Sequence, residues 1–150
     1  MPDPPVIIKV KRLRAGARLP ERATPGSAGF DVCADLGGDG EALELGTMPV
    51  LVPTGIALEI PAGYEVQVRP RSGLSRKGID VAFGTVDADY RGELLVNMAA
   101  RAPGAEPPTI HHGDRIAQIV VAPVVVAVLE EVADLSPTRR GDGGFGSTGR

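Results

Sequence analysis

The last twelve residues carry groups that could bind a phosphorylated ligand. Segment 139–150 holds five glycines around Arg140, Phe145, Ser147 and Thr148. Guanidinium, hydroxyl and glycine N–H groups suit a polyphosphate, and a phenyl ring offers a flat face to a nucleobase. Glycine loses the most backbone entropy on ordering, so the segment is either a disordered tail or an arm that orders around a ligand. Both interpretations stand on this segment alone.

The same segment comes close to a Walker-type phosphate loop without being one. Gly141 and Gly146 have the right spacing before Ser147 and Thr148, but the lysine of that motif is missing. A phosphate site therefore needs contributions from elsewhere in the chain.

A second group of candidate ligands follows a predicted strand. The run Arg69-Pro70-Arg71-Ser72-Gly73-Leu74 leads into a short helix that we expect Ser72 to cap, with the first N–H groups facing an anion. Arg71 adds a forked donor. The structural alternative is a helix cap beside solvated arginines.

Acidic side chains in two further segments could act on water. Asp87 lies beside apolar Val86 in the run from Gly84 to Glu93, where it could be oriented as a general base. A polar turn is the structural alternative. Asp31 is an acid within an otherwise apolar strand, and Gln118 is the one side chain of Gly113–Gln118 that could face a ligand.

Composition limits the function further. The 150 residues are 43% apolar with a net charge of −3, as expected of one globular domain. With 16 basic against 19 acidic residues there is no broad basic surface, so long nucleic acid is not an expected partner and the ligand should be small. No signal peptide or membrane-spanning apolar run is seen, which predicts a cytoplasmic protein. Cys33, the single cysteine, is expected in or near the core, and His111 and His112 in a turn.

Short Val- and Ile-rich runs between frequent glycines and prolines predict an all-β domain, a sandwich, jelly roll or barrel. One helix of one or two turns is expected at Gly73–Lys77, and a hairpin connection at Ile60–Tyr64. Residues 36–47 resemble a surface insertion. The predicted strands are Val6–Val10, Phe30–Ala34, Pro49–Val52, Gly55–Ile60, Glu65–Arg69, Ile79–Phe83, Glu93–Ala99, Arg115–Val121 and Val124–Leu129.

Taken in order, five segments resemble the five motifs of the homotrimeric dUTPase family. The resemblance runs from about residue 6 to the end, and the order of the motifs makes it specific. The segments are Ala28-Gly29-Phe30-Asp31, Pro70–Leu74, Gly84–Gly92, Gly113–Gln118 and Arg140–Gly149.

This resemblance implies a jelly-roll-like β domain over residues 1–138 and a flexible arm over residues 139–150. It also implies a homotrimer that hydrolyses dUTP to dUMP and pyrophosphate with Mg²⁺, which keeps uracil out of DNA and supplies dUMP for dTMP synthesis. Each active site would be shared: the first, second and fourth motifs from one subunit, the third from a neighbour, and the arm from the remaining one. An arm useless to its own subunit would then order over a symmetric partner's site.

The resemblance also implies roles for single residues. Asp87 would activate the attacking water, Tyr90 would pack under the deoxyribose and exclude a 2′-hydroxyl, and Asp31 would hold water on Mg²⁺. Backbone groups of a hairpin around Ile79–Val86, including Val81, Gly84 and Val86, would read uracil. The phosphates and the base would be held by Arg71, Ser72, Gly73, Gln118, Arg140, Phe145, Gly146, Ser147 and Thr148.

Three positions depart from the family pattern. Val81 stands where many members have asparagine, so base reading there must use the backbone; Phe30 replaces a frequent tyrosine and Asp142 a frequent serine. Two rivals stay open: dCTP deaminase, with the same subunit fold and trimer, and a non-catalytic trimer that binds nucleotide or protein. The glycine-rich last motif and the Asp87–Tyr90 pair favour the diphosphohydrolase.

Overall fold

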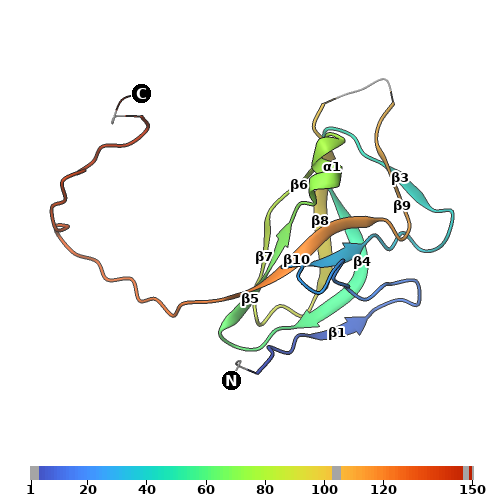
Figure 1. The fold of residues 1–150 in the computed structure, drawn as a ribbon, viewed down its shortest axis with the longest axis horizontal. Coiled ribbons are helices and arrows are strands. Elements are labelled where there is room, and N and C mark those ends of the chain that lie inside the picture. The colour runs from blue at the N-terminus through green and yellow to red at the C-terminus, as the bar shows by residue number, and fades with distance from the viewer. Residues whose placement is uncertain (1–3, 103–105, 147–148, 150) are drawn as a thin grey trace.

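A computed structural model describes residues 4–102, 106–146 and 149. The described chain is almost entirely β (Figure 1). Its elements are β1 (Lys9–Arg12), β2 (Phe30–Cys33), β3 (Ala42–Glu44), β4 (Val50–Glu59), β5 (Tyr64–Arg69), α1 (Ser72–Arg76), β6 (Ile79–Val81), β7 (Gly84–Val86), β8 (Glu93–Ala100), β9 (Thr109–His111) and β10 (Arg115–Pro123).

The strands form two four-stranded antiparallel sheets and a small ribbon. One sheet has the order β1-β4-β8-β6, the other β2-β10-β5-β7, and β3 pairs with β9. Inward-facing residues of both large sheets share one core, because alternate residues of a strand point to the same side. Its fully buried members include Val52, Ile56, Val66, Val96 and Ile116.

Several sequence predictions are confirmed. The domain is all-β, the short helix lies within one residue of its predicted start and end, and His112 lies in a turn, whereas His111, also predicted there, ends β9. Cys33 is half-buried on β2, next to the core. Pro49–Val52 and Gly55–Ile60, predicted as two strands, are one strand, β4, whose pairing with β8 is irregular between Pro53 and Ala57.

Two predicted connections have a different role. Pro61–Gly63 is a turn with Gly63 at φ 86°, but β4 and β5 belong to different sheets, so no hairpin forms there. The predicted strand and hairpin over Ile79–Val86 also cross between sheets, with β6 on β8 and β7 on β5. The turn residues were predicted correctly, but the sheet that each strand joins depends on partner strands distant in the sequence.

Two further predictions are wrong. Residues 36–47 are not a mere surface insertion, because β3 pairs with β9 and Leu45 behind it is 1% exposed. Val124–Leu129 forms no strand: β10 ends at Pro123, and Val126 and Leu129 are more than nine-tenths exposed. These apolar side chains have the pattern of a strand, but they pair with no strand among the described residues.

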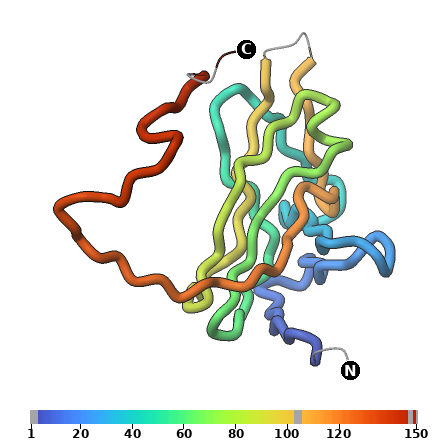
Figure 2. Tube along the Cα trace, turned by 60° about the vertical axis from the view of Figure 1, so that its left-hand side comes forward, coloured from blue at the N-terminus to red at the C-terminus, as the bar shows by residue number. Residues whose placement is uncertain are grey.

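Beyond Pro123 the chain leaves the β domain and runs alongside it at a distance (Figures 1 and 2). No helix or strand forms in the described residues beyond Pro123, which include those of the arm. No described helix is long and apolar enough to cross a membrane.

Candidate active site

Three predicted ligands, Asp31, Arg71 and Gln118, meet on the β2-β10 side of one sheet, together with Arg115, which was not predicted. The Asp31 carboxylate pairs with Arg71 Nε at 2.9 Å and with Arg115 Nη1 at 3.5 Å, and its side chain is 13% exposed. Gln118 lies opposite Asp31 in the β2–β10 register, and its amide donates to the Pro70 carbonyl at 3.0 Å. An added Cβ at Gly29 would lie 2.5 Å from the Gln118 amide oxygen, so only glycine allows this approach. We call Asp31, Arg71, Arg115 and Gln118 the anion cluster.

Helix α1 begins beside this cluster. The residue preceding its first turn is Arg71, and no side chain caps the helix, so the prediction that Ser72 is the cap is wrong. Ser72 and Gly73 are instead the first two helical residues, and both are exposed. Their N–H groups have no acceptor further back in the helix and are free to meet an anion.

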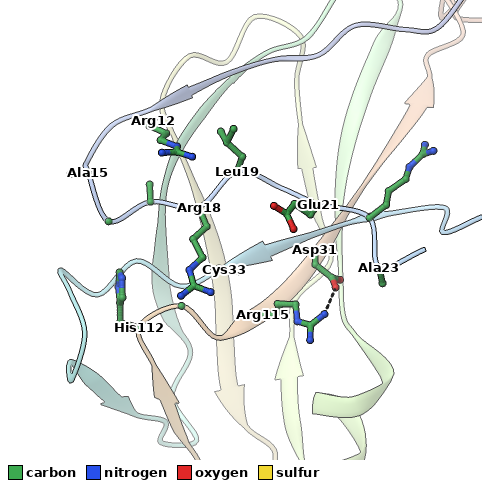
Figure 3. Close-up of a pocket in the computed structure, with 14 residues that line it drawn as sticks. Arg12, Ala15, Arg18, Leu19, Glu21, Ala23, Asp31, Cys33, His112 and Arg115 are labelled. Atoms are coloured by element: carbon green, nitrogen blue, oxygen red, sulfur yellow. Dashed lines mark ion pairs between the residues drawn. The ribbon is translucent and has the colours of Figure 1, made fainter. Parts of the chain in front are cut away.

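A cavity of about 700 Å³ includes Asp31 in its lining (Figure 3). Four arginines, Arg12, Arg18, Arg22 and Arg115, line it against two acids, Glu21 and Asp31. Sequence reasoning assigned a role to none of these four arginines. The basic density of residues 9–22 was the available signal, but only the fold shows that this segment lies against β2.

A second cavity, of about 230 Å³, contains the predicted catalytic residue. Asp87 and Tyr90 line it together with Gly84 and Val86. A tight turn links the pair, with the Tyr90 N–H donating to the Asp87 carbonyl at 3.1 Å. The Tyr90 hydroxyl donates to the Glu93 carbonyl at 2.9 Å, which fixes the ring over the following residues. We call residues 87–90 the catalytic turn.

Val81 is separated from this second cavity. It is buried on β6 and lines a different hollow, with Asn97 and Met98. The residues predicted to read the base therefore belong to two sheets: Val81 lies on β6, whereas Gly84 and Val86 lie on β7.

The anion cluster and the catalytic turn lie at opposite edges of one sheet. In the order β2-β10-β5-β7, Asp31 belongs to the first strand and Asp87 directly follows the last. Three strand spacings of about 4.8 Å separate them by roughly 14 Å across the sheet, and the offset along the strands adds to this, because Asp31 is level with Arg69 whereas Val86 is level with Val66. A single phosphate and its attacking water cannot touch both at once, because reacting atoms must come within about 3.5 Å.

The described arm residues stand away from the β domain (Figures 1 and 2). Arg140 donates within the arm to the Gly143 carbonyl at 2.7 Å, and Phe145 is fully exposed. Gly146, also exposed, has a φ of 86°. Ser147 and Thr148 lie outside the described residues.

The donors available for a metal are few. Among residues 4–102, 106–146 and 149, no three His, Cys, Asp or Glu side chains gather as a metal site. Asp31 offers one largely buried carboxylate beside an arginine-rich cavity. Mg²⁺ keeps several waters and binds one or two carboxylates together with substrate phosphates, so Asp31 is the group in this cluster that could hold it.

Comparison with known proteins identifies the family. The family model for dUTPase matches residues 15–149. This chain belongs to the dUTPase family. Deoxyuridine 5′-triphosphate nucleotidohydrolase of Desulfotalea psychrophila is 55% identical over 87% of each chain, and that of Beijerinckia indica is 54% identical over 99% of this chain and 94% of its own.

Solved dUTPases show the same fold. The Staphylococcus bacteriophage 80alpha dUTPase with dUpNHpp superposes with a TM-score of 0.83 at 28% identity, covering 96% of this chain and 99% of that one. The dUTPase of phage phi11, whose structure describes coordination of a structural Mg(II) ion, has a TM-score of 0.74 at 26% identity, covering 85% and 97%. The prediction of family from five ordered motifs is confirmed.

Proposed function

We propose that this protein hydrolyses dUTP to dUMP and pyrophosphate, keeping uracil out of DNA and supplying dUMP for dTMP synthesis. One observation carries the proposal. Asp87 and Tyr90 share one small cavity, in a chain whose relatives are named for this reaction over nearly their full length. We further expect it to act without long nucleic acid, since the net charge is −3. We also expect it to act in the cytoplasm.

The enzyme is proposed to be a homotrimer of jelly-roll-like subunits with shared sites. Its support is the separation, at least about 14 Å, between the anion cluster and the catalytic turn in one subunit, so that a neighbour's turn would complete the cluster. The arm supports it too: Phe145 is fully exposed, Arg140 donates to Gly143 of the arm itself, and three-fold symmetry would bring an arm to each site. Most of the apolar residues Val124–Leu129 are exposed in the single chain and would be covered in such an assembly.

Within that site, each group has one task. Asp87 would accept a hydrogen bond from the attacking water and align it with the α-phosphorus. Arg71 and the N–H groups of Ser72 and Gly73 would neutralise the α- and β-phosphates, with Gln118 beside them. This type of reaction needs alignment and charge stabilisation more than covalent help.

The remaining groups hold the ends of the substrate. Arg140, Ser147 and Thr148 would take the γ-phosphate, and Phe145 and Gly146 would cover the uracil. Tyr90 would lie under the deoxyribose, where a 2′-hydroxyl would collide with its ring. Asp31 would hold Mg²⁺ through water, and the ion when bound supplies charge neutralisation on the phosphates. Backbone groups near Val81, Gly84 and Val86 would read uracil.

The test compares Asp87→Asn with Asp89→Asn, a matched change in the same exposed turn. Pyrophosphate release from dUTP, dCTP, dTTP and UTP with Mg²⁺ is measured in parallel with ammonia release and with binding of a non-hydrolysable dUTP analogue. We expect release from dUTP alone, lost in Asp87→Asn with analogue binding retained, and kept in Asp89→Asn. Turnover by Asp87→Asn would remove this carboxylate from the mechanism. Ammonia from dCTP would indicate a deaminase, and no reaction at all a binding protein.

A further inference from the structure

The position of the Tyr90 ring depends on the residue that begins β8. The Tyr90 hydroxyl has one described acceptor, the Glu93 carbonyl at 2.9 Å. The ring lies so close to Gly92 that an added Cβ there would be 2.5 Å from Cζ of Tyr90. Any shift of the Gly92–Glu93 backbone therefore moves the ring.

The Glu93 side chain fixes this backbone to β4. The ladder between β4 and β8 is irregular between Pro53 and Ala57, so Gly55 has no ordinary ladder partner on β8. The Glu93 carboxylate accepts the Gly55 N–H at 2.8 Å in its place. Gly55 has a φ of 69°, and an added Cβ would lie 2.7 Å from Cβ of Ala17, so this break is built into the sequence.

Arg14 locks the carboxylate from the other side. Its guanidinium pairs with Glu93 and, through Nε at 2.8 Å, with Asp35, whose side chain is 2% exposed. Asp35 is held in turn by the Gly37 N–H at 3.3 Å. The hydrogen bond from Arg14 lowers the pKa of Glu93, so the carboxylate is charged at neutral pH. Buried Asp35 is thus connected through Arg14 to Glu93, the first residue of β8.

We propose that Glu93, held by Arg14 and the Gly55 N–H, is a positioning residue that sets the Tyr90 ring and thereby the discrimination between dUTP and UTP. This inference rests on the proposed function for its substrate and on the contacts above for its mechanism. A displaced ring leaves room for the 2′-hydroxyl, and small misplacements of positioning groups have large effects on rate. Glu93 lines the same cavity as Tyr90, but its carboxylate is occupied by Arg14 and the Gly55 N–H, so its effect on the ring is indirect.

The first test uses Glu93→Gln, which keeps the side-chain volume but removes the charge that binds Arg14. Arg14→Lys is the second variant, because lysine keeps the charge but cannot fork between two carboxylates, whereas full removal would strand buried Asp35. Arg101→Met is the control: it breaks a comparable pair with Asp80, at 2.7 Å, at the opposite end of β8.

For Glu93→Gln and Arg14→Lys we expect the ratio of kcat/KM for dUTP over UTP to fall about ten-fold. The Arg101→Met ratio should not change. Lower thermal stability with an unchanged ratio would mean that Glu93 is merely structural, and would overturn the proposal.

A second measurement works without any substrate. The chain has no tryptophan and two tyrosines, so in a Tyr64→Phe background the tyrosine emission reports on Tyr90 alone. Tyr90 is 45% exposed, so its release in Glu93→Gln should raise acrylamide quenching by up to about two-fold. Unchanged quenching would overturn the positioning role. If the parent protein fails to hydrolyse dUTP, the proposed function fails, while quenching still decides whether Glu93 positions the ring.

Discussion

Replacing Gly92 by alanine tests the catalytic turn with a single methyl group. The added Cβ would lie 2.5 Å from Cζ of Tyr90, whereas ordinary contacts begin at 3.4 Å. The φ of Gly92 is not in the left-handed region, so alanine is compatible with the backbone. The strain therefore falls on the Tyr90 ring, which must retreat by about 0.9 Å.

The size of the effect follows from that displacement. Such a shift carries the Tyr90 hydroxyl out of hydrogen-bond range of the Glu93 carbonyl, now 2.9 Å away, at a cost of about 1 kcal/mol in stability. A misplacement of this size in a positioning group costs about 10²-fold in rate. We expect kcat/KM for dUTP to fall by about that factor, with a smaller fall for UTP because the ribose gains room.

The assay is pyrophosphate release over a range of dUTP and UTP concentrations, with thermal unfolding in parallel. Gly46→Ala is the control, since an added Cβ there meets nothing within 4 Å and needs no unusual backbone conformation. A folded Gly92→Ala enzyme with the parent's rate and selectivity would refute the packing of Tyr90 on Gly92 as the basis of discrimination.

Three further outcomes are expected. Deleting residues 139–150 should leave a folded trimer that has lost most of its turnover. Arg140→Ala should lower turnover more than Phe145→Ala, because stacking on one base contributes about 1–3 kcal/mol whereas a guanidinium meets charge in the transition state. Persistent activity after the deletion, or a reversed order of the two substitutions, would contradict the arm's role. Burial raises the pKa of Cys33 above 9.0, so at pH 8 its thiolate fraction stays below about one tenth and labelling by a thiol reagent should be slow; labelling as fast as free cysteine would contradict this. The pKa of Glu93 lies below its ordinary 4.5, so its stabilising contacts with Arg14 are complete above pH 4.5 and are lost only as the pH falls through the lowered pKa. Acrylamide quenching of Tyr90 in the Tyr64→Phe background should therefore be constant from pH 7 to 5. A rise in quenching within that range would refute this expectation.

The elements of this fold could be predicted because they depend on short-range pattern. Alternating apolar residues identify β8, where Leu94, Val96 and Met98 are buried, and Gly63 identifies the turn after β4. Pairing partners could not be predicted, since nothing in the residues near Ile79–Val86 indicates that β6 and β7 join different sheets. Val124–Leu129 failed for the same reason: its apolar pattern suits a strand, but a strand requires a partner.

The site divides in a similar way. Motif order predicted Asp31, Arg71, Asp87 and Tyr90, and the structure places the first two together and the last two together. The residues that sequence reasoning missed act through contacts across the fold. Glu93 is 79 positions from Arg14 and 38 from Gly55, and no local spacing relates them.

The missed contacts explain how a turn with few interactions of its own can hold a catalytic geometry. Asp87 and Tyr90 are both exposed, so the core does not fix them directly. The hydrogen bond to the Glu93 carbonyl and the close approach of the ring to Gly92 transfer the rigidity of β8 to the ring, and the hydrogen bond from the Gly55 N–H to the Glu93 carboxylate transfers that of β4 to β8. If a neighbouring subunit supplies the residues that bind the phosphates, each subunit must present this turn in the correct shape before assembly. The Arg14–Glu93 pair lies within one subunit and can do so independently of the partner.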